Sequence, residues 1–309
     1  ITDVLSAAVR TYLSTKVSVL TTSRAVRVPA LPTALTVGDW NGDKRLDVAS
    51  VSVSTGELVA LINIGSGDLL SASPMKVGSL PSGIVAAELT GDGKLDLAVT
   101  LAGEGKLQIL TGNGDGSFVA GYVATGLTKP RALAVADFDA DGKQDLAVTG
   151  GNSVTVFLGS GTGTFTAQAP LVVGENAYAV LATDLNADGS IDLAVSSQSG
   201  NVVRVLRNDG HGSFTVLAPL AVGSSPVALA AADLDGDKVL DLVVTSVGSG
   251  TVSVLRGLGQ DRYAPALSFA AGASPWGLAA ADLSGDKRPD VTIAGFEPER
   301  ALLLGNVSK

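Results

Sequence analysis

The sequence predicts an all-β fold made of repeated four-stranded units. Its apolar segments are short and rich in Val, Leu and Ala, and 38 glycines and 12 prolines among 309 residues interrupt them, as in strands joined by tight turns. An acidic nine-residue loop recurs at spacings of 49, 49, 47, 49 and 49 residues, beginning at 39, 88, 137, 184, 233 and 282. Four strands in a unit of this length form one blade of a β-propeller.

The elements of each unit follow in a fixed order. An apolar strand precedes the acidic loop and a strand of the LDLAV type follows it, as in 133–136 and 146–149. A strand of the VSVL type, a glycine-rich turn and a fourth strand complete the unit. Glycines in the turns at 112–116, 159–163 and 208–212 supply the positive φ of tight hairpins. The aromatic residues after these turns are predicted to pack between neighbouring blades: Phe118, Phe165, Phe214 and Tyr263.

The repeat count predicts six blades in a single propeller domain spanning residues 1–309. Residues 276–305 supply three strands of the last unit, and residues 24–29 align with a fourth strand, so we expect the two ends of the chain to share a blade. Residues 3–8 and 16–20 also resemble strands. The alternative is a seventh, degenerate blade at the termini, and the strands within residues 1–23 are left unassigned.

The charge of the chain is concentrated in the acidic loops. The net charge is −9, but the six loops hold 20 of the 30 acidic residues, which leaves 10 acids against 14 Lys and Arg elsewhere. The acidic balance argues against nucleic acid as a partner. No apolar run reaches the ~18 residues of a membrane span, so direct membrane insertion is not expected. There is no cysteine, which excludes thiolate metal sites.

The acidic loops are predicted metal sites. Each places side-chain oxygens at loop positions one, three, five and nine, and position seven can add its backbone carbonyl. The predicted ligands are Asp39, Asn41, Asp43, Arg45 and Asp47; Glu88, Thr90, Asp92, Lys94 and Asp96; Asp137, Asp139, Asp141, Lys143 and Asp145; Asp184, Asn186, Asp188, Ser190 and Asp192; Asp233, Asp235, Asp237, Val239 and Asp241; and Asp282, Ser284, Asp286, Arg288 and Asp290.

Calcium is the ion that these loops favour, with up to six per chain. Only oxygen donors are offered, and the ligand number and flexible loop favour Ca²⁺ over Mg²⁺. The loop opens like an EF-hand loop but lacks flanking helices and a glutamate at position twelve. An Asx turn is the alternative for any single loop, although six copies at one period favour metal binding. The loops at 137 and 233 carry four carboxylates each and are expected to bind most tightly, whereas Glu88 makes the second loop the weakest.

These loops resemble the FG-GAP or VCBS-type repeats of integrin α-subunit propellers, secreted bacterial proteins and some fungal lectins. The resemblance covers residues 24–305 and rests on the pattern D-x-[DN]-x-D-[GK]-x-x-D followed by an LAV-type strand. It implies a propeller with calcium between the first and second strands on one face and a ligand or partner on the opposite face. Many members of the family have seven blades.

A ring of equivalent positions lies six residues before each loop, on the predicted opposite face. Three of them, Arg131, Tyr178 and Trp276, offer stacking and hydrogen-bonding groups for a sugar or a peptide side chain. The alternative is that they cover the central channel. The only histidine, His211, lies in a hairpin turn, and no second His or Cys accompanies it. The sequence therefore predicts a protein that is not an enzyme, with a polysaccharide-lyase-like activity as the alternative.

The predicted function is that of an extracellular or cell-surface recognition or adhesion module, made rigid by calcium, for a protein or carbohydrate ligand. The location is expected because weak calcium sites fill only where calcium is near millimolar. A scaffold domain within a larger secreted protein is the alternative role.

Overall fold

The computed structural model describes residues 2–3, 8–16, 19–66, 68–283, 285–297 and 300–304. The chain divides into two compact units, and each is described by itself. The first unit comprises residues 1–135, 142–150 and 156–168, and the second comprises residues 136–141, 151–155 and 169–309. Within the described residues, no helix has the length and apolar character that a membrane crossing requires.

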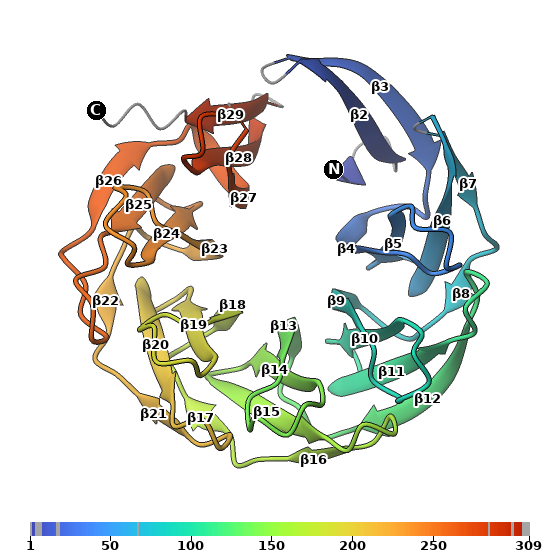
Figure 1. The fold of residues 1–309 in the computed structure, drawn as a ribbon, viewed down its shortest axis with the longest axis horizontal. Helices are drawn as coiled ribbons and strands as arrows, with labels where there is room; N and C mark the ends of the chain where they lie inside the picture. Colours follow the sequence, from blue (N-terminus) through green and yellow to red (C-terminus); the bar gives the residue numbers. More distant parts are fainter. Residues whose placement is uncertain are drawn as a thin grey trace. The chain divides into compact units, whose positions relative to one another are not determined.

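The first unit contains three of the antiparallel blades, whose strands follow one another in sequence order (Figure 1). A short extra strand, β8, pairs with β6 beside β7 in the first of them. The bounds in the first blade are β4 (Pro32–Gly38), β5 (Asp47–Ser52), β6 (Glu57–Gly65), β7 (Asp68–Ser71) and β8 (Met75–Lys76). The second has β9 (Pro81–Ala87), β10 (Asp96–Leu101), β11 (Lys106–Gly112) and β12 (Phe118–Ala124). The third has β13 (Pro130–Ala136), β14 (Asp145–Gly150), β15 (Ser153–Gly159) and β16 (Phe165–Ala167), with residues 136 and 153–155 counted in the second unit.

The second unit contains two further blades of the same order. β17 (Leu171–Val172) pairs with the first residues of β15. The fourth blade has β18 (Ala177–Thr183), β19 (Asp192–Ser197), β20 (Val202–Asn208), β21 (Phe214–Val216) and a short strand β22 (Leu220–Ala221) beside β20. The fifth has β23 (Pro226–Ala232), β24 (Asp241–Ser246), β25 (Thr251–Leu255) and β26 (Leu267–Ala270).

The structure confirms an all-β propeller but corrects the number of blades: within the described residues five blades are complete, not six or seven. The remaining strands form two three-stranded sheets. One consists of β1 (Thr2–Asp3), β2 (Ala8–Lys16) and β3 (Val19–Arg27), and the other of β27 (Ala273–Ala281), β28 (Asp290–Glu297) and β29 (Arg300–Leu304). The expectation that residues 24–29 add a fourth strand to the last unit is wrong, because β3 pairs with β2 along its whole length.

Burial explains why the strands have these sequences. All six residues of β10, β19 and β24 are buried, because each of these second strands has a paired strand on both sides and packed residues on both faces. Such strands read as continuous apolar runs rather than as alternating ones. By contrast, all four residues of the outer strand β26 are exposed.

The aromatic residues after the hairpin turns do pack between neighbouring blades. Phe118 of β12 meets Trp40 of the first blade's loop edge to face, with ring centroids 5.7 Å apart. Phe214 of β21 meets Phe138 in the same way at 5.6 Å. In both pairs the partner is the second residue of the acidic loop in the preceding blade. The loops therefore take part in the packing between blades.

Candidate metal centres and binding rim

Each acidic loop joins the first and second strands of its sheet, as predicted. The carboxylate at position one curls the loop by accepting backbone N–H groups. Asp39 accepts from Gly42 at 2.8 Å and from Lys44 at 2.7 Å. Asp233 accepts from Gly236 at 2.7 Å and from Lys238 at 2.9 Å. The Asx-turn alternative therefore describes the backbone of these loops correctly. It is compatible with an ion, because the Oδ2 atoms of Asp39 and Asp233 each accept a single N–H and keep a further lone pair.

Position six of every loop has a positive φ. The three lysines adopt it as well as the glycines: φ is 66° at Lys44, 69° at Lys238 and 69° at Lys287. This is the conformation that favours glycine. The loop therefore keeps the same backbone conformation even where position six is a lysine, for which a positive φ is unfavourable.

The carboxylate at position five holds the second half of the loop. It accepts the N–H of position seven: Asp188 from Ser190 at 2.8 Å and Asp237 from Val239 at 2.8 Å. Cations near these carboxylates balance part of the charge. Lys94 lies 3.6 Å from Asp92, and Arg45 forms an ion pair with Asp43. The predicted use of position-seven carbonyls as ligands stays a prediction.

The aspartate at position nine has a structural role that the sequence did not reveal. Asp96 is fully buried, and its two oxygens accept N–H groups from Leu89 at 2.9 Å and Gly112 at 2.9 Å. The same pair of hydrogen bonds recurs at Asp47, Asp192 and Asp241. Each joins position two of the loop to the end of the third strand. The one available signal was that this aspartate opens the most apolar strand of each unit.

Burial also changes the acidity of these aspartates. Desolvation raises the pKa of Asp192 to about 6 and raises the pKa of Asp241, despite the N–H groups that favour their ionised forms. Neighbouring carboxylates add to the effect: Asp188 and Asp261 at Asp192, and Asp235 and Asp237 at Asp241.

Two loops gather carboxylates closely enough to hold a cation. Among the described residues, Asp137, Asp139 and Asp145 offer oxygens within 4.8 Å of one another, and so do Asp233, Asp235 and Asp237. These are the two loops that carry four carboxylates. The predicted ligand Ser284 lies outside the described residues.

The difference between loops gives a test. We expect Asp141→Ala or Asp237→Ala to remove about one bound calcium per chain, because each deletes the central carboxylate of a four-carboxylate loop. Thr90→Ala is expected to leave the calcium content nearly unchanged, because Glu88 already weakens that loop. Metal analysis after dialysis against micromolar calcium measures all three. Equal losses would contradict the ranking by carboxylate count.

The ring of positions six residues before each acidic loop, called the rim from here on, contains residues with two different roles. Thr33 donates a hydrogen bond to the Pro81 carbonyl at 3.0 Å, and Ser82 donates to the Pro130 carbonyl at 2.7 Å. These small residues thus bridge neighbouring blades. Val227 is buried, with 5% of its surface exposed.

The larger rim residues of the second unit meet one another. The rings of Tyr178 (β18) and Trp276 (β27) have centroids 6.3 Å apart and are tilted by 50°. Trp276 keeps 39% of its surface exposed. Arg131 belongs to the first unit and lies on β13. The structure therefore brings two of the three predicted rim residues together.

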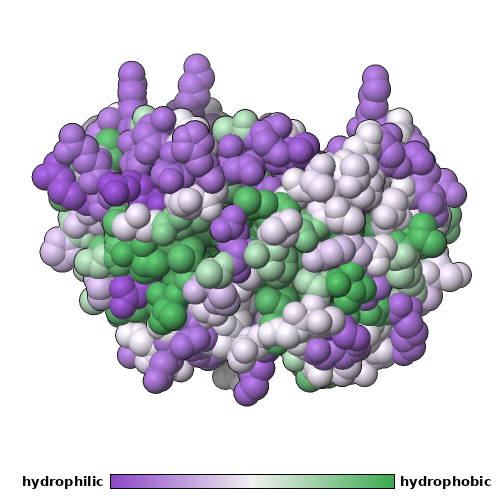
Figure 2. All heavy atoms as spheres, turned by 90° about the horizontal axis from the view of Figure 1, so that it is seen from below, coloured by the Kyte–Doolittle hydropathy of each residue, from purple (hydrophilic) through white to green (hydrophobic). Residues whose placement is uncertain are grey.

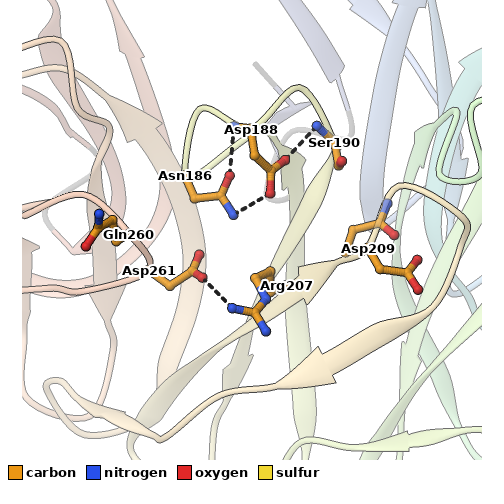
Figure 3. A pocket seen from close by; sticks show the side chains of 8 residues that line it. Asn186, Asp188, Ser190, Arg207, Asp209, Gln260 and Asp261 are labelled. Carbon is orange, nitrogen blue, oxygen red and sulfur yellow. Dashed lines mark hydrogen bonds and ion pairs between the residues drawn. The ribbon is translucent and has the colours of Figure 1, made fainter.

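A polar pocket of about 410 Å³ lies beside the fourth loop, and sequence reasoning missed it (Figure 3). Three elements of the second unit line it: the acidic loop, the hairpin after β20 and the turn after β25. Across the pocket, Nη1 of Arg207 lies 3.4 Å from Oδ2 of Asp261. The lining residues are Asn186, Asp188, Ser190, Arg207, Asn208, Asp209, Gln260 and Asp261.

The surface is divided by polarity. Figure 2 shows hydrophilic residues along the upper edge of the face in view and in smaller groups along its lower edge, with apolar residues across its middle. In the second unit, exposed apolar side chains come from outer strands, as Val172 at 65% and Leu267 at 64% exposure illustrate. On the face in view, hydrophilic groups thus lie mainly along the edges.

Comparison with known proteins agrees with the repeat. The FG-GAP-like repeat family matches residues 39–99, 88–148, 137–195, 184–244 and 238–293. No curated protein sequence matches the chain. An Agrocybe aegerita lectin that recognises non-reducing terminal N-acetylglucosamine is similar in structure, with a TM-score of 0.62, 19% identity and coverage of 91% of this chain and 79% of that one. BBS1N, solved in complex with ARL6DN, has a TM-score of 0.63 at 13% identity, covering 87% and 77%.

Similar structures also include named enzymes, which corrects the prediction that this protein is not an enzyme. The periplasmic gluconolactonase of Pseudomonas aeruginosa has a TM-score of 0.61 at 17% identity, covering 92% of this chain and 77% of that one. Two propellers from Bacteroides are described as putative 6-phosphogluconolactonases. The fold thus occurs in proteins named as enzymes, and the lack of a second His or a Cys in this chain does not exclude catalysis.

Proposed function

Because the chain belongs to the FG-GAP-like repeat family, we propose that it is a calcium-binding recognition module whose ions stiffen the blades and whose ligand binds at the Tyr178–Trp276 pair. The observation that carries the calcium proposal is the convergence of Asp233, Asp235 and Asp237 within 4.8 Å of one another. Three carboxylates at that distance repel one another unless a cation lies between them.

The donor set suits a hard cation. Oxygen is the only ligand type in the loops, and hard cations such as Ca²⁺ take six to eight oxygens. The N–H groups that hold Asp233 and Asp237 fix the carboxylates in place while leaving lone pairs for an ion. When bound, calcium supplies the positive charge that offsets this repulsion. The residues of the chain supply the geometry.

Ordering the loops also orders the contacts between blades. The carbonyl at position two of a loop accepts an N–H from the next blade's hairpin: Trp40 from Gly116 at 3.2 Å, Leu89 from Gly163 at 2.8 Å and Phe138 from Gly212 at 3.0 Å. The N–H of the same residue, in Trp40 and Leu89, donates to the position-nine aspartate. A stiff loop therefore stiffens the junction to the next blade.

The rim supports recognition of a carbohydrate. Two aromatic rings set at an angle offer flat apolar faces on which sugar rings stack, with the Trp and Tyr polar groups as hydrogen-bonding partners. Asn176, two residues before Tyr178, adds an amide that lies 2.5 Å from Gln198. The similar lectin recognises N-acetylglucosamine, which supports a sugar ligand. The BBS1N complex with ARL6DN supports a protein ligand as the second candidate.

An extracellular or cell-surface location belongs to the same proposal. Loops with three carboxylates, such as 39–47 and 282–290, bind calcium weakly and fill only near millimolar calcium. Calcium is that abundant outside cells.

Replacing Trp276 tests the rim. Trp276→Ala is expected to weaken binding of a glycan found by array screening about tenfold or more, because central aromatic anchors carry ~2 kcal/mol or more of binding energy. Calcium content and melting temperature are expected to stay unchanged. Leu267→Ala, which removes a still more exposed apolar side chain from β26, is the control. A large loss of stability with unchanged affinity would show that Trp276 is a packing residue instead.

A further inference from the structure

The hairpin after β25 departs from the other hairpins at one position. Its residue Asp261 stands where three equivalent hairpins have a glycine, namely Gly116, Gly163 and Gly212. Asp261 has a φ of 60°, and the preceding Gln260 has a φ of 54°. A left-handed conformation favours glycine and costs other residues free energy. A side chain is thus present at a position where the fold prefers none.

The side chain of Asp261 is mostly buried, and its carboxylate is incompletely satisfied. Only 12% of its side-chain surface is exposed. Its Oδ2 faces the Arg207 guanidinium at 3.4 Å, which is a long contact, and its Oδ1 is buried and accepts no hydrogen bond. A buried carboxylate oxygen without a partner is costly. The Asp261 carboxylate therefore lacks the close cation or hydrogen-bond donor that would offset its burial.

The fourth acidic loop lies on the other side of the same pocket. Asn186, Asp188 and Ser190 line it with Asp261, and Figure 3 shows the Asp261 carboxylate between Arg207 and Asn186. This loop has one carboxylate fewer than the loops at 137 and 233, because Asn186 replaces an aspartate at position three. It is not among the described loops that bring three carboxylates within 4.8 Å. What the loop lacks is one further acidic oxygen.

We propose that Asp261, from the fifth blade, provides the missing carboxylate for the calcium ion of the fourth-blade loop 184–192. The inference rests on the proposed calcium binding. The ion at this loop is then held by two blades at once, and the Asp261 carboxylate gains a cation closer than Arg207. Arg207, whose side chain is 49% exposed, balances the charge of Asp261 in the calcium-free protein and is free to turn to solvent when the ion binds.

The test uses substitutions that are expected to have opposite effects on the stability of the calcium-free and the calcium-bound protein. Asp261→Gly restores the residue of the other hairpins, so it is expected to raise the melting temperature of the calcium-free protein while reducing the increase that calcium produces. Asp261→Asn keeps a residue that tolerates positive φ and is expected to weaken calcium binding at this loop about tenfold or more. Calorimetric titration with CaCl₂ and thermal melting, each with and without EGTA, measure these effects.

Matched variants complete the experiment. Asp209→Asn removes the same charge from the same pocket but keeps the oxygen that accepts N–H groups from His211 at 2.9 Å and Ser213 at 3.2 Å, so calcium affinity is expected to change less than twofold. Asp188→Asn disables the loop itself, and adding Asp261→Gly to it is expected to cause no further loss of calcium binding. Tyr263→Phe tests the nearby buried hydroxyl, which also has no hydrogen-bond partner; it is expected to leave calcium affinity unchanged.

A role limited to holding Arg207 or the hairpin predicts the reverse pattern. Asp261→Gly would then lower the melting temperature without calcium and leave the calcium-induced increase intact, which would overturn the proposal. A wild-type protein that binds no calcium would instead refute the proposed function itself. The two failures are therefore distinguishable.

Discussion

Removing calcium is expected to lower the melting temperature by more than 10 °C while leaving much of the β structure intact at low temperature. An ion that binds only the folded state stabilises it by about 2.7 kcal/mol at a concentration 100 times its Kd. For a chain of this size, each kcal/mol shifts the melting temperature by roughly 1.5–2 °C. The two loops that bring carboxylates within 4.8 Å, together with weaker contributions from the others, give a shift of this size.

Circular dichroism melts with excess CaCl₂ and with excess EGTA measure the effect. Excess MgCl₂ is the control, and it is expected to restore only a small part of the stability, because Mg²⁺ demands a stricter octahedral geometry than these loops provide. Identical melting curves in calcium and EGTA, with metal analysis confirming that the EGTA sample is free of metal, would contradict a stabilising role for calcium.

Asp96→Ala is expected to destabilise the protein by about 2–4 kcal/mol, even in EGTA. The substitution leaves the N–H groups of Leu89 and Gly112 buried without an acceptor, and each such group costs about 1–3 kcal/mol. This loop is the weakest predicted calcium site. The loss of stability therefore measures how much the hydrogen bonds from Asp96 to the loop and to the third strand contribute. Urea denaturation measures it.

Asp92→Ala in the same loop is the matched control. Asp92 accepts one N–H, from Lys94 at 3.0 Å, near the surface, so its loss is expected to cost no more than about 1 kcal/mol. If Asp92→Ala and Asp96→Ala destabilise the calcium-free protein equally, the two hydrogen bonds of the buried Asp96 carboxylate are not what holds the loop.

The sequence predicted the repeated parts of the fold well, because each blade carries its own local signals. The loop at 137 has strands on both sides, and the aromatic residues after two hairpins pack against the preceding blade, as expected. The blade count was wrong because partner choice is not local. Residues 24–27 have the alternation of an outer strand, yet they pair with β2 rather than with the last sheet.

The site was predicted in part for the same reason. Loop positions one, three and five follow from a repeated motif. The link that Asp96 makes between the loop and the third strand depends on a hydrogen bond from the N–H of Gly112, sixteen residues away in the chain. The spacing of the residues alone does not reveal that hydrogen bond. The contact between Tyr178 and Trp276 joins residues from different sheets. Asp261 left a trace in the sequence, since its turn breaks the glycine pattern of the other hairpins, but only the structure shows its buried oxygen.

The most direct test of the central claim is the number of calcium ions bound per chain. Equilibrium dialysis of the metal-free protein against ⁴⁵Ca²⁺, from micromolar to millimolar concentrations, measures it. We expect about two ions to bind first, at the loops beginning at 137 and 233, and the total to rise toward one per acidic loop, six in all. No saturable binding at millimolar calcium would contradict the account.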